Sequence, residues 1–130
     1  MLAIMRLHIP AVAYVLALAV VACGGSDSGP SYAELYAEAH RIEIQATALG
    51  IDTPCEADAS CSVLVFAGVC SDLYAPLSLA SSNADRAVSL STEQRRLMEA
   101  AMRAFPPSTS CAAPPNRPAA LCVQAQCTLR

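Results

Sequence analysis

A chain of 130 residues with 55% hydrophobic residues and a formal net charge of −3 is long enough for one domain with its own core. Its eight basic residues are all arginines, and they leave no basic surface that could neutralise nucleic-acid phosphates. Nucleic acid is therefore excluded as a partner. Seven cysteines in so short a chain favour an oxidising compartment, because cytosolic thiols stay reduced.

The N-terminus has the pattern of an export signal. One positive charge, Arg6, precedes an apolar stretch over residues 9–21. Its length is typical of the apolar region of a signal peptide, about 7–15 residues, and is short for a membrane span of roughly 20. An uncleaved anchor helix is the less favoured alternative. Met1 and Met5 are both candidate start residues, and a start at Met5 would place the positive charge of Arg6 next to the N-terminus.

Cys23 follows the apolar stretch directly. Residues 20–22 read Val-Val-Ala, which suits cleavage just before Cys23. The run Val-Val-Ala-Cys resembles the lipobox of bacterial lipoproteins, with valine where leucine is commonest. The resemblance implies that the Cys23 sulfur carries a diacylglycerol thioether and that the new amine is often acylated. Two or three acyl chains anchor a protein where one gives only marginal binding.

A disulfide at Cys23 in a secreted protein is the alternative to lipidation. Assigning Cys23 to a lipid leaves six cysteines, an even number that can all pair. The next residues, 24–30, are rich in glycine and serine, typical of a flexible spacer with a reach of roughly 25 Å. Gly24 stands where the family's inner-membrane retention signal would place aspartate, so the resemblance implies the outer membrane in a host with two membranes. The predicted segments are a lipoprotein signal peptide over 1–22, a lipidated cysteine and tether over 23–30, and one domain over 31–130.

The domain begins with a predicted helix over residues 32–49. Ser31 and Glu34 match a capping box, in which the serine hydroxyl and the glutamate carboxylate each bond a backbone amide of the other residue. Gly50 is a natural stop. The apolar face is formed by Leu35, Ala39, Ile42, Ala46 and Leu49.

A second helix is predicted over residues 91–105. Ser91 and Gln94 match another capping box, although the helix could begin earlier, near Asn83 or Asp85. Two prolines follow and end it. Its apolar stripe consists of Leu90, Leu97, Met98, Ala101 and Phe105.

Strands are predicted between and after the helices. Residues 61–70 are short, apolar and valine-rich, which indicates a buried strand, and the residues from Tyr74 are a plausible partner. Pro76 confines that partner to an edge or an irregular start. Residues 110–130 read as a short strand, a proline-rich crossing and a hairpin that turns at residues 124–125, with poor turn residues for that geometry.

The six remaining cysteines follow the pattern C-x5-C-x8-C-x40-C-x10-C-x4-C, and six cysteines allow 15 pairings. The sequence alone does not choose among them. Cys122 and Cys127 would face each other across the final hairpin as a non-hydrogen-bonded pair, whose close Cα atoms suit a disulfide. The pairing we favour is Cys55–Cys61, Cys70–Cys111 and Cys122–Cys127, in which the middle bridge contributes most, roughly 4 kcal/mol. The predicted fold class is α+β: a small disulfide-stapled domain with two helices packed on a short antiparallel sheet.

From Pro54 onward the chain resembles a group of small cysteine-rich bacterial lipoproteins of unassigned function. The resemblance covers a little over half of the chain. It is carried by "PCEADASC", the strand to Cys70, an Arg/Glu-rich helix and the closing "LCVQAQC". It implies no known activity.

Motifs for catalysis or metal binding are weak or missing in the sequence. His40, near Glu43, lacks an accompanying nucleophile motif, and we interpret it as a surface histidine. Glu56 and Asp58 lack the alternating oxygen ligands of a calcium loop, and the cysteines lack the tight C-x2-C pairs of zinc sites. We therefore expect no cofactor, no metal and no enzymatic activity. A charged, solvated helix face is expected from Glu93, Arg95, Arg96, Glu99 and Arg103.

The sequence thus predicts a non-enzymatic lipoprotein of the cell envelope. Lipid on Cys23 would hold it to the membrane, and its domain would bind a protein partner whose identity the sequence does not specify. The alternative is a periplasmic module that holds a small apolar molecule between the two helices and the sheet.

Overall fold

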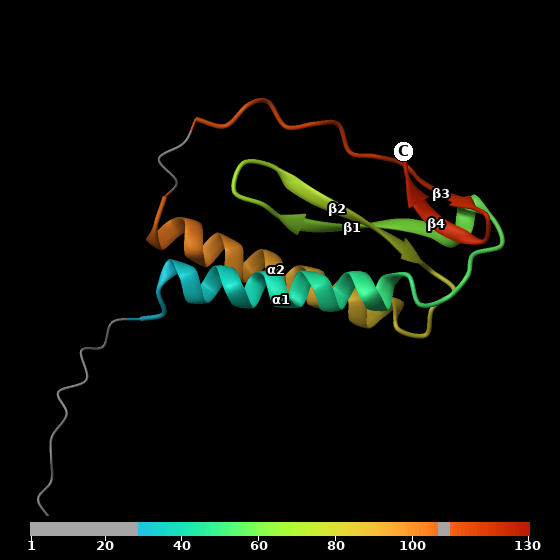
Figure 1. Cartoon of the computed structure of the whole chain (residues 1–130), viewed down its shortest axis with the longest axis horizontal. Helices are drawn as coiled ribbons and strands as arrows, with labels where there is room; N and C mark the ends of the chain where they lie inside the picture. The colour runs from blue at the N-terminus through green and yellow to red at the C-terminus, as the bar shows by residue number, and fades with distance from the viewer. Residues whose placement is uncertain (1–28, 107–109) are drawn as a thin grey trace, which may run out of the picture.

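The computed structural model describes residues 29–106 and 110–130, so the predicted signal peptide, Cys23 and most of the tether lie outside the described residues. In these residues the fold is α+β, with two helices and two small antiparallel sheets. In Figure 1 the helices lie side by side along one face of the first hairpin, and the second hairpin lies at the end far from the start of α1. The elements are α1 (Tyr32–Gly50), a 3-10 turn η1 (Asp58–Ser60), β1 (Cys61–Ala67), β2 (Asp72–Ser78), α2 (Ala84–Ala104), β3 (Ala120–Val123) and β4 (Gln126–Leu129).

Helix α1 begins as predicted, at a complete capping box. The Glu34 amide donates to the Ser31 hydroxyl at 3.3 Å, and the Ser31 amide donates to the Glu34 carboxylate at 2.7 Å. Gly50 ends the helix, but it has no left-handed backbone conformation. A Cβ at Gly50 would lie 3.1 Å from both the Leu64 side chain and the Pro76 carbonyl. Glycine is used here because the helix end approaches the sheet closely.

Helix α2 begins at Ala84, near the earlier of the two expected starts, and the second predicted capping box is wrong. Ser91 and Gln94 lie inside the helix and face the core. The Ser91 hydroxyl donates to the Val88 carbonyl at 2.8 Å, a bond that a serine within a helix commonly makes. Of the predicted apolar stripe, Met98 and Ala101 are buried, Leu90 and Leu97 are half-buried, and Phe105 is exposed just beyond the helix.

Strands β1 and β2 form the predicted antiparallel pair, in a register that runs from Cys61 opposite Ser78 to Ala67 opposite Asp72. Pro76 lies opposite Val63, and the backbone groups of this pair point away from the partner strand. The sheet therefore loses no hydrogen bond because proline lacks an N–H. The inward side chains pack on the helices around Ala46 and Ala87. This core contains Leu64, Phe66, Ala75 and Leu77.

The C-terminal hairpin turns at Gln124 and Ala125 as predicted. Both residues have positive φ, 52° and 60°, which matches the two-residue turns of hairpins. The short strand expected at the beginning of residues 110–130 is not formed, and regular structure resumes only at β3. In Figure 1 the segment before β3 runs along the sheet on the side away from the helices.

Candidate functional site

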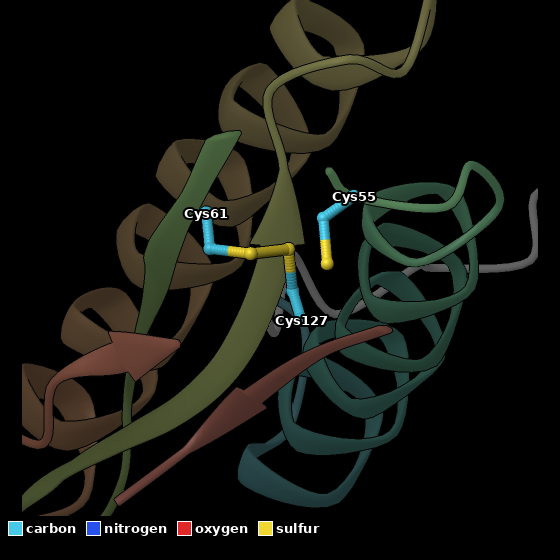
Figure 2. Close-up of side chains that lie close together, drawn as sticks. All are labelled: Cys55, Cys61 and Cys127. Atoms are coloured by element: carbon cyan, nitrogen blue, oxygen red, sulfur yellow. A yellow bond between two sulfur atoms is a disulfide. The ribbon is translucent and has the colours of Figure 1, made fainter. Parts of the chain in front are cut away.

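Four of the six disulfide cysteines gather where the C-terminal hairpin meets the start of β1. Cys55 precedes η1 and is bonded to Cys122 in β3, with Cα atoms 5.9 Å apart. Cys61 opens β1 and is bonded to Cys127 in β4, with Cα atoms 5.5 Å apart. Figure 2 shows Cys55 beside the Cys61–Cys127 bridge, and the Sγ atoms of these three cysteines are within 4.8 Å of one another. We call these four cysteines the sulfur cluster.

All six cysteines in the described part of the chain form disulfides, and the predicted Cys70–Cys111 bridge is confirmed. The predicted Cys55–Cys61 and Cys122–Cys127 bridges are wrong. Cys122 and Cys127 do face each other in the hairpin, but cross-strand partners share one face of a sheet, so both side chains point to the body of the domain. There each meets a cysteine of the earlier segment. The resulting bridges span 67 and 66 residues and constrain the unfolded chain more than short loops would.

Two hydrogen bonds, one of them to a side chain, hold the hairpin beside the sulfur cluster. The Cys55 amide donates to the Ala125 carbonyl at 3.0 Å, so the turn is bonded to the segment before η1. The Asp58 carboxylate accepts from the Cys122 amide at 2.7 Å. Asp58, considered for calcium in the sequence, thus bonds the hairpin, and both Asp58 and Glu56 are exposed. Among the described residues, Cys55, Cys61 and Cys127 form the one group of histidine, cysteine and acidic side chains compact enough for a metal, and their sulfurs are all in disulfides.

Gln94 is a buried polar residue whose role the sequence reasoning missed. Its side-chain amide accepts from the Ala67 amide and donates to the Ala67 carbonyl, both at 2.9 Å. Ala67 ends β1 in a pair whose backbone groups point away from β2, so Gln94 takes the place of a neighbouring strand. The one signal available was a glutamine on the apolar face of α2, and the capping-box spacing pointed to another role.

His40 lies beside a groove of about 240 Å³ near the start of α1. Its Nδ1 is 3.5 Å from the Glu43 carboxylate, and the side chains are 59% and 26% exposed. Ser71, in the turn between β1 and β2, lines the same groove but makes no hydrogen bond to His40 in the described part of the chain. The groove therefore contains a histidine and a carboxylate, but no nucleophile hydrogen-bonded to that histidine. Apolar side chains of Tyr36, Val69, Leu73 and Met98 form much of its wall.

A second cavity of about 310 Å³ lies at the opposite end, between the residues that follow α1 and the C-terminal turn. Ser78 lines it with a buried hydroxyl that has no hydrogen-bond partner within residues 29–106 and 110–130. Asp52, also in its wall, accepts from Asn83 at 2.7 Å and from Thr53 at 2.9 Å. Hydrogen bonds from the side chains of Ser81, Asn83 and Thr53 hold the pKa of Asp52 below its ordinary value of 3.8.

The charged face predicted on α2 is exposed and carries ion pairs. Arg96 pairs with Glu93 at 2.6 Å, and Arg103 lies 4.0 Å from Glu99. Arg95 reaches Asp72 at the start of β2 at 3.1 Å. Exposed pairs of this kind contribute little to stability.

No helix in the described part of the chain has the length and apolar character needed to cross a membrane. Comparison with family models, with curated proteins and with solved structures found no match to this chain. The function is therefore inferred from the residues of the chain itself.

Proposed function

We propose that this chain is a lipid-anchored lipoprotein of the cell envelope whose domain binds a protein partner without catalysing a reaction. The observation that carries the proposal is the run Val-Val-Ala-Cys, which ends at Cys23 and is followed by a Gly/Ser-rich spacer. Helix α1 begins at Tyr32, directly after that spacer. The arrangement suits a compact domain carried on a short tether, and Gly24 favours the outer membrane in a host with two membranes.

An aromatic surface at the tether end of the domain is the best candidate for binding the partner. The Tyr32 ring stacks on Tyr36 with centroids 5.9 Å apart and meets Phe105 edge-on at 6.2 Å. Tyr36 and Phe105 remain 45% and 48% exposed, and Leu73 across the first groove is 43% exposed. Exposed tyrosines beside a groove are typical anchors of protein interfaces. Since this surface adjoins the tether, its partner would also lie close to the membrane.

The alternative, a module for a small apolar ligand between helices and sheet, has less support. Phe66, Leu64 and Leu77 fill the space between these layers. The two cavities lie at the ends of the domain, and their volumes of about 240 and 310 Å³ are at or below the low end for small-molecule pockets, roughly 300 Å³.

The anchor is tested by Cys23→Ser. Wild-type protein extracted from membranes should show the mass of a chain beginning at Cys23 plus diacylglycerol and acyl groups, and it should fractionate with the envelope. The variant should lack that added mass and appear in the soluble fraction. An unmodified Cys23 thiol in membrane-extracted wild-type protein would contradict the anchor.

Partner binding is tested by crosslinking in the native envelope, followed by mass spectrometry of the products. Tyr36→Ala with Leu73→Ala should reduce crosslinking to the identified partner by about tenfold or more, as expected for interface anchors. Val88→Ala is the matched control, because Val88 is 47% exposed and lines neither cavity. Equal crosslinking in all three proteins would exclude this surface. A small molecule retained in native mass spectrometry, without a protein partner, would favour the alternative.

A further inference from the structure

The two disulfides of the sulfur cluster are neighbours that could exchange partners. Each bridge has a cysteine that lies close to a cysteine of the other bridge. Cys122 and Cys127 are opposite each other in the hairpin register, and the Cys55 sulfur lies within 4.8 Å of both sulfurs of the Cys61–Cys127 bridge. Figure 2 shows the Cys55 side chain pointing toward that bridge.

We propose that the sulfur cluster is a thiol–disulfide exchange site, which accepts two electrons from an external dithiol and then moves the open thiol from one bridge to the other. The proposal rests on the described cysteines alone and is independent of the lipid anchor and of the protein partner.

The first step is reduction of the Cys55–Cys122 bridge. A thiolate of the dithiol attacks the sulfur of Cys122, a half-buried residue, and Cys55 leaves as a thiolate. The second thiol of the reagent then attacks the reagent's first sulfur, which is bonded to Cys122 in the mixed disulfide. Cys122 is released and takes up a proton. The dithiol is oxidised to a disulfide by two electrons, and Cys55 and Cys122 are reduced.

The second step is exchange within the chain and transfers no net electrons. The Cys55 thiolate attacks the sulfur of Cys127, a Cys55–Cys127 bond forms, the Cys61–Cys127 bond breaks, and Cys61 leaves as a thiolate that takes up a proton. Cys55 and Cys127 are only 3% and 7% exposed, whereas Cys61 is half-buried. Exchange therefore moves the reactive thiol from a buried cysteine to a more accessible one.

The Cys70–Cys111 bridge provides a matched control in the same molecule. It joins the turn after β1 to the segment before β3, and its cysteines are exposed. Its sulfurs do not belong to the group within 4.8 Å. A thiol opened there is expected to stay where it is formed.

The test uses full-length, exported Cys122→Ser, with Cys111→Ser as the control. Each variant loses one bridge and is treated with iodoacetamide over time, digested without reduction, and mapped by mass spectrometry. In Cys122→Ser we expect the alkyl group to accumulate on Cys61, together with a Cys55–Cys127 disulfide. In Cys111→Ser it should appear on Cys70 alone. Alkylation confined to Cys55, with Cys61–Cys127 intact, would overturn the proposal.

A measurement on the wild-type protein covers the case in which Cys122→Ser does not fold. The oxidised protein is mixed with less than one equivalent of dithiothreitol, quenched with iodoacetamide, and the singly reduced molecules are isolated. Exchange predicts molecules alkylated on both Cys61 and Cys122, joined by a Cys55–Cys127 bridge. If the molecules alkylated in the cluster always carry both groups on the two ends of one native bridge, the cluster does not exchange.

Discussion

Gln94 bonds the end of β1 on the side that faces away from β2. The Ala67 amide and carbonyl point away from β2, and in a two-stranded sheet they would otherwise need water or another element. Gln94 is 1% exposed, and its amide satisfies both groups with bonds of 2.9 Å. One side chain of α2 thereby sets the position of the helix along β1.

Replacing Gln94 by leucine is expected to destabilise the domain by about 2–4 kcal/mol, because a buried donor and a buried acceptor each lose their partner. Leucine has a similar size, so the loss reflects the hydrogen bonds more than a cavity. Chemical denaturation of the oxidised protein measures the free energy of unfolding. Thr92→Ala, on the exposed side of the same helix, should change it by no more than about 0.5 kcal/mol. An unchanged free energy in Gln94→Leu would show that the two bonds are dispensable.

At the scale of single elements, the start of α1 depends on a carboxylate. The Ser31 backbone amide, and then the Ser31 hydroxyl, hold the pKa of Glu34 below its ordinary value of 4.5. Because the pKa is lower in the folded state than in the unfolded state, the ionised group stabilises the fold above about pH 4.5. That contribution is lost as the pH falls through the folded-state pKa.

Glu34→Gln should therefore be less stable than wild type near pH 6, and the difference between the two should shrink as the pH is lowered to about 3. Denaturation midpoints measured across this range test the prediction. Glu56→Gln, at an exposed position before η1, is the control and should follow wild type. If the difference in stability between wild type and Glu34→Gln stays constant with pH, the capping box does not depend on the charge. The stability of both proteins still falls in acid, because other carboxylates, such as Glu38 beside Arg41, also lose their charge there.

At the scale of the whole molecule, disulfides hold the C-terminal segment in place. All three bridges join residues 111–127 to residues 55–70, so the segment is bonded at both of its ends. Cys127 is its one buried residue within the described positions 110–130. A segment with so little buried apolar surface cannot offset the entropy of ordering by packing alone. The helices and the first hairpin, in contrast, have a core of their own.

The two bridges of the sulfur cluster should be non-additive in stability by about 1 kcal/mol. Removing the Cys55–Cys122 bridge or the Cys61–Cys127 bridge leaves the other to close the same long loop, so each loss should cost only about 3 kcal/mol. Removing both opens that loop as well and should cost about 7 kcal/mol. Paired Cys→Ser variants studied by chemical denaturation test this.

A useful comparison is the paired replacement of Cys70 and Cys111, whose bridge closes a shorter loop nested inside the other two. Because the outer bridges already restrict that segment, its loss should cost about 3 kcal/mol, less than the roughly 4 kcal/mol expected for the same loop alone. Simple additivity of the two cluster bridges would contradict the shared loop.

Local patterns in the sequence predicted the elements well. The Ser31–Glu34 capping box, the strand that opens at Cys61 and the turn at residues 124–125 are all formed. Each depends on neighbours within a few residues, or on a period that a single segment shows. The same kind of pattern misled at Ser91, where the spacing of a capping box occurs inside a helix whose true start lies at Ala84.

The fold class and the participation of six cysteines in disulfides follow from the sequence by itself, because periodicity and an even count are local or additive properties. The pairing and the bonds of Gln94 were decided only by the tertiary structure. Cys122 and Cys127 lie opposite each other in either case, and their bridges depend on which segment packs against that face of the hairpin. Such contacts join residues 66 or 67 positions apart, and local patterns in the sequence carry no information about contacts over that separation.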